Sequence, residues 1–188
     1  MIRLRWMAFS LLLVANLASA QLTIEITQGA DDPTSIALVP FDWRGSGALS
    51  EDIPQIVADD LQRAGQFEPV ARENMLGYPH RSGDVFYRDW RAIGAEYVVV
   101  GRISRPSAND PYTVEYELLD VLQQKRVLNR RLRGTATQLR DLAHKISDEV
   151  YEQLTGIKGA FSTRILYVVA NHAGGAFNYQ LRMSDFDG

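Results

Sequence analysis

Apolar residues recur along the chain with two different periods, which predict where strands and helices lie. Residues 36–41 are almost all apolar over the length of one strand, which is typical of a strand covered on both faces. Apolar residues next recur at helical spacing, at Ile53, Ile56, Val57, Leu61 and Ala64. Residues 50–52 offer a cap and acidic side chains for the start of this helix, and Gly65 suits its end.

The segment between this helix and the middle of the chain predicts short elements. We expect a loop at residues 42–49, a short strand at 67–71 and a loop at 77–83. A short helix at 89–93, ended by Gly94, leads into residues 95–103, whose apolar core is typical of a central strand.

Residues 112–119 alternate strictly and predict one strand of a hairpin. Val114, Tyr116 and Leu118 share one face, and Thr113, Glu115 and Glu117 share the other. A second strand is predicted at about 126–135, and a turn near 123–125 makes the pair antiparallel. A long helix follows, with its apolar stripe at Leu139, Leu142, Ala143, Ile146, Val150 and Leu154 and its end at Gly156.

This order of elements predicts an α/β (α+β) fold, in which helices pack on a mixed sheet. We place this domain at residues 34–159. Residues 164–170 and 179–184 predict two further strands, joined by residues 171–175. Because two strands do not form an independently stable sheet, residues 160–188 are expected to be the first part of a second, all-β domain.

The first twenty residues predict a signal peptide. Arg3 and Arg5 precede an apolar run at residues 6–18, and Ala18-Ser19-Ala20 places small residues where a signal peptidase cleaves. The alternative is a membrane anchor, but the run is shorter than the roughly 20 apolar residues that cross a bilayer. We therefore expect cleavage between Ala20 and Gln21, with export out of the cytoplasm and no direct membrane insertion.

Residues 21–33 predict a strand-competent tail and a turn. Leu22, Ile24 and Ile26 alternate with polar residues, and a turn or linker at residues 31–34 follows. Such a strand can add to an exposed sheet edge of a partner through its backbone hydrogen bonds. It can equally pair within its own sheet, and the spacing does not decide between the two.

Composition excludes several kinds of chemistry. The chain has no cysteine, so it has neither disulfides nor thiolate metal sites. Its formal net charge is −3, and loss of Arg3 and Arg5 makes it more acidic, which argues against nucleic-acid binding. His80, His144 and His172 lack the spacing of a helical metal site. We expect a solvated or capping role for His144, and no cofactor, metal or catalytic residue.

The remaining polar clusters each have a plain structural interpretation. The loop at residues 45–50 lacks the full pattern of a phosphate-binding loop, so we expect an ordinary loop and cap. Glu115 and Glu117 are interpreted as the solvated side of a hairpin, and residues 59–60 as the outer side of a helix. Residues 185–188 predict a β-turn rather than a calcium loop.

One basic cluster lies on the predicted second strand of the hairpin. Its members are Lys125, Arg126, Arg130, Arg131 and Arg133. The favoured interpretation is an edge strand protected by charge against aggregation. A protein-binding patch is the alternative.

Three blocks of sequence resemble the TolB family, the periplasmic component of the Tol-Pal system. The blocks are residues 37–41 (ALVPF), residues 60–67 (DLQRAGQF) and above all residues 148–161 (DEVYEQLTGIKGAF). Residues 184–188 are similar to the start of the family's β-propeller. The resemblance covers essentially the whole chain after residue 20.

The resemblance implies a non-catalytic adaptor that supports outer-membrane integrity and constriction in cell division. It implies an α/β domain before a six-bladed β-propeller, with TolA bound by the mature amino terminus and Pal bound by the propeller. The segment expected to bind TolA consists of Gln21, Leu22, Thr23, Ile24, Glu25, Ile26, Thr27, Gln28, Gly29, Ala30, Asp31 and Asp32. Two alternatives stay open, namely an accessory domain of a propeller hydrolase and a small-ligand-binding module.

Overall fold

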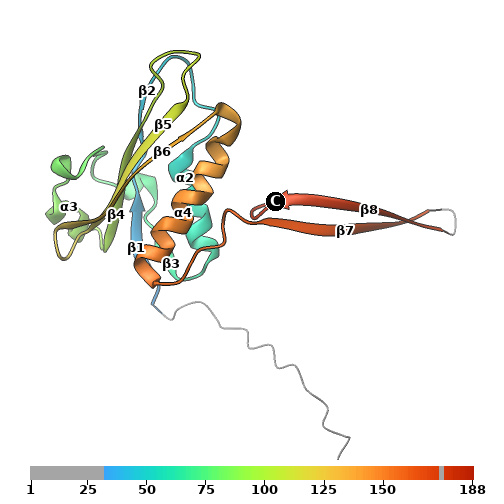
Figure 1. The fold of residues 1–188 in the computed structure, drawn as a ribbon. Coiled ribbons are helices and arrows are strands. Elements are labelled where there is room, and N and C mark those ends of the chain that lie inside the picture. The colour runs from blue at the N-terminus through green and yellow to red at the C-terminus, as the bar shows by residue number, and fades with distance from the viewer. Residues whose placement is uncertain (1–31, 174–175) are drawn as a thin grey trace, which may run out of the picture.

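The computed structural model describes residues 32–173 and 176–188 (Figure 1). Six strands form one mixed sheet in the order β3-β1-β4-β5-β6, with β2 pairing to β4, and β7 and β8 form a separate sheet. The strands are β1 (Thr34–Leu38), β2 (Asp42–Arg44), β3 (Phe67–Pro69), β4 (Tyr97–Ser104), β5 (Tyr112–Asp120), β6 (Lys125–Gly134), β7 (Arg164–Ala173) and β8 (Ala176–Asp185). The predicted α/β class, a mixed sheet with packed helices, is confirmed.

Helices cover both faces of the large sheet (Figure 1). The helices are α2 (Ile53–Arg63), α3 (Tyr87–Ala92) and α4 (Leu139–Thr155), with short 3-10 turns η2 (Arg72–Asn74), η3 (Ser82–Asp84) and η4 (Ala136–Gln138). One apolar cluster joins α2 and α4 to one face, and a second joins the segment around α3 to the other. The predicted caps hold in part, since Asp52 caps α2 and Gly156, at φ 74°, ends α4.

The predicted strand at residues 36–41 is wrong at its end. β1 stops at Leu38, and the chain bends at residues 39–41 before β2 pairs with β4 in turn. The bend carries Phe41 over β4 at Gly101, where an added Cβ would lie 2.8 Å from the Phe41 ring. Pro40 donates no backbone hydrogen bond, which fits a break in the ladder. The predicted loop at 42–49 therefore begins with a short strand that the pattern did not reveal.

The hairpin of β5 and β6 follows the prediction closely. Val114, Tyr116 and Leu118 are buried against the helices, as their alternation predicts. The turn places Gln124 at φ 53°, and a bulge lies between Leu118 and Leu119. In the described part of the chain β6 pairs with no strand other than β5, so it lies at an edge of the sheet.

The second hairpin is longer than predicted and projects from the α4 side of the domain (Figure 1). Residues 171–173 lie in β7, so the loop predicted at 171–175 is wrong at its start. Both faces carry exposed apolar side chains, with Leu166, Val168, Tyr179 and Leu181 on one face and Ile165 and Tyr167 on the other. Such a ribbon is marginally stable in isolation, and its membership of a larger all-β domain stays a prediction.

Candidate functional site

The predicted partner-binding tail lies mostly outside the described residues. Residues 21–31 are not described, and neither is the expected cleavage point between Ala20 and Gln21. Asp32 is exposed, and the chain then leads through Pro33 directly into β1. Thr34, which was expected in a turn, is the first residue of β1. The TolA-binding role of the tail stays a prediction.

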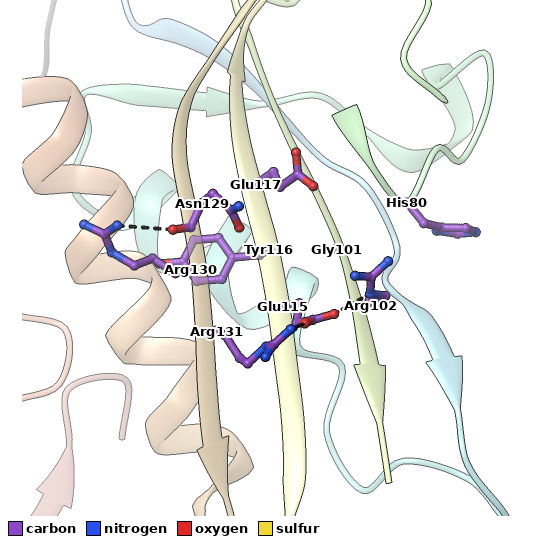
Figure 2. Close-up of a pocket in the computed structure, with 9 residues that line it drawn as sticks. All are labelled: His80, Gly101, Arg102, Glu115, Tyr116, Glu117, Asn129, Arg130 and Arg131. Atoms are coloured by element: carbon purple, nitrogen blue, oxygen red, sulfur yellow. Dashed lines mark hydrogen bonds and ion pairs between the residues drawn. The ribbon is translucent and has the colours of Figure 1, made fainter. Parts of the chain in front are cut away.

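A polar hollow of about 370 Å³ lies over β4, β5 and β6 (Figure 2). Glu115 lies between Arg102 and Arg131 and pairs with both, with Arg131 Nε donating to Glu115 Oε1 over 2.6 Å. The hydrogen bond from Arg102 is the main reason that the pKa of Glu115 is lowered, and Arg131 adds to it. Since Glu115 stays ionised, it is suited to binding cations rather than to donating a proton.

The two glutamates of this face are less solvated than the sequence suggested. The Glu115 and Glu117 side chains are only 20% and 17% exposed, and Glu117 pairs with Arg126 over 3.2 Å. His80 closes the hollow from the loop before α3, and its Nδ1 is buried with no hydrogen-bond partner among the described residues. The hollow therefore presents fixed charges of both signs.

A buried polar cluster joins α2 to α4. Asp60, fully buried, accepts hydrogen bonds from His144 Nδ1 over 2.8 Å and from Ser147 Oγ over 2.7 Å. His144 is 2% exposed. The expectations that Asp60 faces outward and that His144 is solvated or capping are both wrong. The carboxylate of Asp60 is the main reason that the pKa of His144 is raised, which favours the imidazolium form.

The spacing of apolar residues along α2 indicates that Asp60 is buried, and so could have predicted this cluster. Asp60 lies three residues after Val57 and four before Ala64, which places it on the apolar stripe. A carboxylate at such a position needs a partner inside the core, because an unpaired buried charge is costly. His144 and Ser147 lie three apart on α4 and supply that partner.

The same cluster holds the end of the β7–β8 hairpin. Asp187 pairs with Arg140 on α4, and its Oδ1 lies 3.7 Å from His144 Nε2. The Phe186 ring packs edge-on against Phe161, with centroids 5.4 Å apart. Gly188 N donates to Asp185 O over 3.3 Å, in agreement with the predicted turn. Asp187 thus extends a contact from the second sheet into the interior of the first domain.

The three side chains Asp60, His144 and Asp187 come close enough to be considered as metal ligands, with candidate atoms within 4.8 Å. Their present partners argue against that use. His144 Nδ1 is hydrogen-bonded to Asp60, and Arg140 places a cation on Asp187. The arrangement instead suits an imidazolium between two carboxylates.

The glycine-containing loop before α2 has structural partners. Trp43 Nε1 donates to Gly47 O over 2.8 Å, and Asp52 caps α2. Both oxygens of Asp52 accept from Arg72 at 2.8 Å, and this pairing is the main reason that the pKa of Asp52 is lowered. A permanent carboxylate at the start of α2 disfavours a bound phosphate.

These features define a class: an α/β domain with helices on both faces of a mixed sheet, joined through a buried polar cluster to a separate antiparallel sheet. A family model described as the TolB amino-terminal domain matches residues 22–127. The chain belongs to this TolB family.

Relatives and a solved structure resemble the chain over most of its length. The Tol-Pal system protein TolB of Marinomonas sp. (strain MWYL1) is 50% identical over 96% of this chain and 42% of that protein. The protein of the same name from Alcanivorax borkumensis is 46% identical over 97% of this chain and 42% of its own length. The crystal structure of TolB from Acinetobacter baumannii is 37% identical, with a TM-score of 0.72, over 87% of this chain and 39% of that one. The chain thus spans less than half the length of these relatives.

Proposed function

We propose that this protein is a periplasmic, non-catalytic adaptor of the Tol-Pal system. The observation that carries the proposal is its family membership, supported by 50% identity over 96% of the chain to a Tol-Pal system protein TolB. In this role the protein helps to maintain outer-membrane integrity and supports constriction in cell division. Among the described residues no helix has the length and apolar character needed to span a membrane.

In this proposal the mature amino terminus, residues 21–32, binds TolA as an added strand. Leu22, Ile24 and Ile26 then face the partner's pockets while the backbone completes the hydrogen-bond ladder. Pal is bound by the β-propeller that residues 160–188 begin. The Asp187 contact with α4 links the second sheet to the domain that carries the tail.

The test is a calorimetric titration of the purified TolA C-terminal domain into the protein. Deleting residues 21–32 is expected to abolish binding without lowering the melting temperature, because β1 begins at Thr34. Ile24→Asp is expected to weaken binding strongly, and Thr23→Asp, on the opposite face of the strand, is the matched control. Unchanged affinity after the deletion would overturn the proposed role of the tail.

Signal cleavage provides a second experiment. Cleavage before Gln21 creates the amino terminus that the proposal requires, so an uncleaved form is expected to bind TolA poorly. A variant with Ala20 replaced by a residue that blocks cleavage can be titrated beside the processed protein. Equal affinity of the two forms would show that processing does not expose the binding strand.

A further inference from the structure

We propose that the free edge of β6 is a docking site for an extended acidic segment of a partner protein, which joins the sheet as an additional strand. This site is separate from the amino-terminal tail. Through the tail the protein supplies a strand to a partner, whereas at β6 its sheet receives one. The inference does not depend on TolA or Pal binding, and its test uses neither protein.

The edge is long and accessible. β6 runs over ten residues without a proline, and its only strand neighbour in the described part of the chain is β5. The Asn129 carbonyl oxygen accepts a hydrogen bond from Nη1 of Arg130 over 3.1 Å, and the Arg130 side chain is 54% exposed (Figure 2). This carbonyl oxygen accepts from a side chain of its own strand rather than from a backbone N–H of a neighbouring strand. A strand edge of this kind is a template for pairing.

The edge is strongly cationic on a chain that is acidic overall. Residues 125–134 contain five basic side chains and no acidic one, whereas the formal net charge of the chain is −3. Three of the cations pair with glutamates of the same domain, namely Arg126 with Glu117, Arg130 with Glu149 and Arg131 with Glu115. Within residues 32–173 and 176–188, Lys125 and Arg133 have no ion-pair partner. These two cations remain for a carboxylate from another chain.

The charges select one kind of occupant. A second copy of β6 would place arginines opposite arginines, and like charges directly opposite one another destabilise a strand pair. The same cations therefore prevent self-association while favouring a strand of opposite charge. Arg131 and Arg133 are two residues apart and share a face of the sheet. A partner with acidic residues at alternate positions would place its carboxylates beside both of them, next to the hollow in Figure 2.

The test is fluorescence anisotropy with a labelled nine-residue peptide in which glutamate alternates with valine and threonine. The purified protein is expected to bind it saturably and more weakly as salt is raised, because charge pairing contributes. The double variant Lys125→Glu, Arg133→Glu is expected to bind at least about tenfold more weakly, since it turns the two unpaired cations of the edge, one on each face of the sheet, into anions. Neither residue has an ion pair in the described structure, and equal melting curves will show that the fold is kept.

Three controls separate strand addition from other causes. Arg88→Glu changes a side chain that is 91% exposed on α3 and is expected to leave binding unchanged. A peptide N-methylated at alternate residues keeps its charges but loses backbone donors, and it is expected not to bind. Binding of this peptide as tight as the parent, equal binding of a lysine-substituted peptide, or absence of any binding to the acidic peptide would each overturn the proposal. Sedimentation showing dimers whose stability Arg133→Glu changes would assign the edge to a second copy instead.

Discussion

The buried pair of Asp60 and His144 gives the sharpest prediction, because both groups lie in the core and bond each other directly. Asp60→Ala removes the acceptor for His144 Nδ1 and for Ser147 Oγ. Hydrogen bonds to a charged group contribute roughly 1.5–3 kcal/mol each, and breaking a buried pair by removing one partner costs about 3–5 kcal/mol. We therefore expect Asp60→Ala to lower the free energy of unfolding by about 3–5 kcal/mol.

Urea unfolding followed by tryptophan fluorescence measures this loss, since Trp90 is buried in the domain. A double-mutant cycle with His144→Ala isolates the pair and is expected to give a coupling of roughly 1–3 kcal/mol. When Asp60 is lost, the one Ser147 hydroxyl proton can turn to Ala143 O, and Ser147→Ala is expected to cost less than Asp60→Ala. Additivity of the two alanine variants within about 0.5 kcal/mol would refute the direct pairing.

The pair also predicts how stability depends on pH. The pKa of His144 is raised above its ordinary value of 6.5, so the folded protein holds this proton more tightly than the unfolded chain. The resulting stabilisation is complete below pH 6.5 and is lost as the pH rises through the raised pKa. Unfolding measured on both sides of this range is expected to show a larger loss in the parent protein than in Asp60→Ala, where only Asp187 still favours the imidazolium. An identical pH profile in both proteins would contradict this assignment.

Three further substitutions have definite expected outcomes. Gly101→Ala places a Cβ 2.8 Å from the Phe41 ring and 2.7 Å from a backbone oxygen, and we expect a destabilisation of about 1–3 kcal/mol in urea unfolding; an unchanged midpoint would contradict it. Gly156→Ala introduces a side chain at φ 74° with open space around it, so only the left-handed backbone conformation is unfavourable. We expect the free energy of unfolding to fall by about 1 kcal/mol. Asp187→Ala is expected to speed proteolysis of the β7–β8 hairpin before the domain is cut, which mass spectrometry of timed digests can detect.

Much of the fold could be predicted because apolar residues recur with a clear period along its strands and helices. The alternation around Tyr116 predicted both the hairpin and its buried face, and the stripe of α4 predicted that helix and its end at Gly156. The break after Leu38 was not predictable in the same way. It depends on the absence of a side chain at Gly101, a residue far away in sequence, and local patterns do not report such contacts.

The candidate sites were less predictable, because their partners come from distant segments. Asp60 and His144 are 84 residues apart, and each was interpreted from its own helix as a surface group. The charged face of β5 was interpreted as solvated, although β4 and β6 supply the arginines that enclose Glu115. Prediction of either cluster requires the strand order and the helix packing, which come from the folded structure.

The position of β1 has a mechanical consequence for the tail that precedes it. β1 is paired on both sides, to β3 and to β4, and its last residues are buried in the core. When a pulling force reaches Thr34 along the strand axis, it loads the hydrogen bonds of both neighbours together instead of opening them one at a time. Forced unfolding is governed by the rate of crossing the unfolding barrier, and several bonds sharing a load raise that barrier. Tension that reaches Thr34 is thus borne by two strand pairings at once.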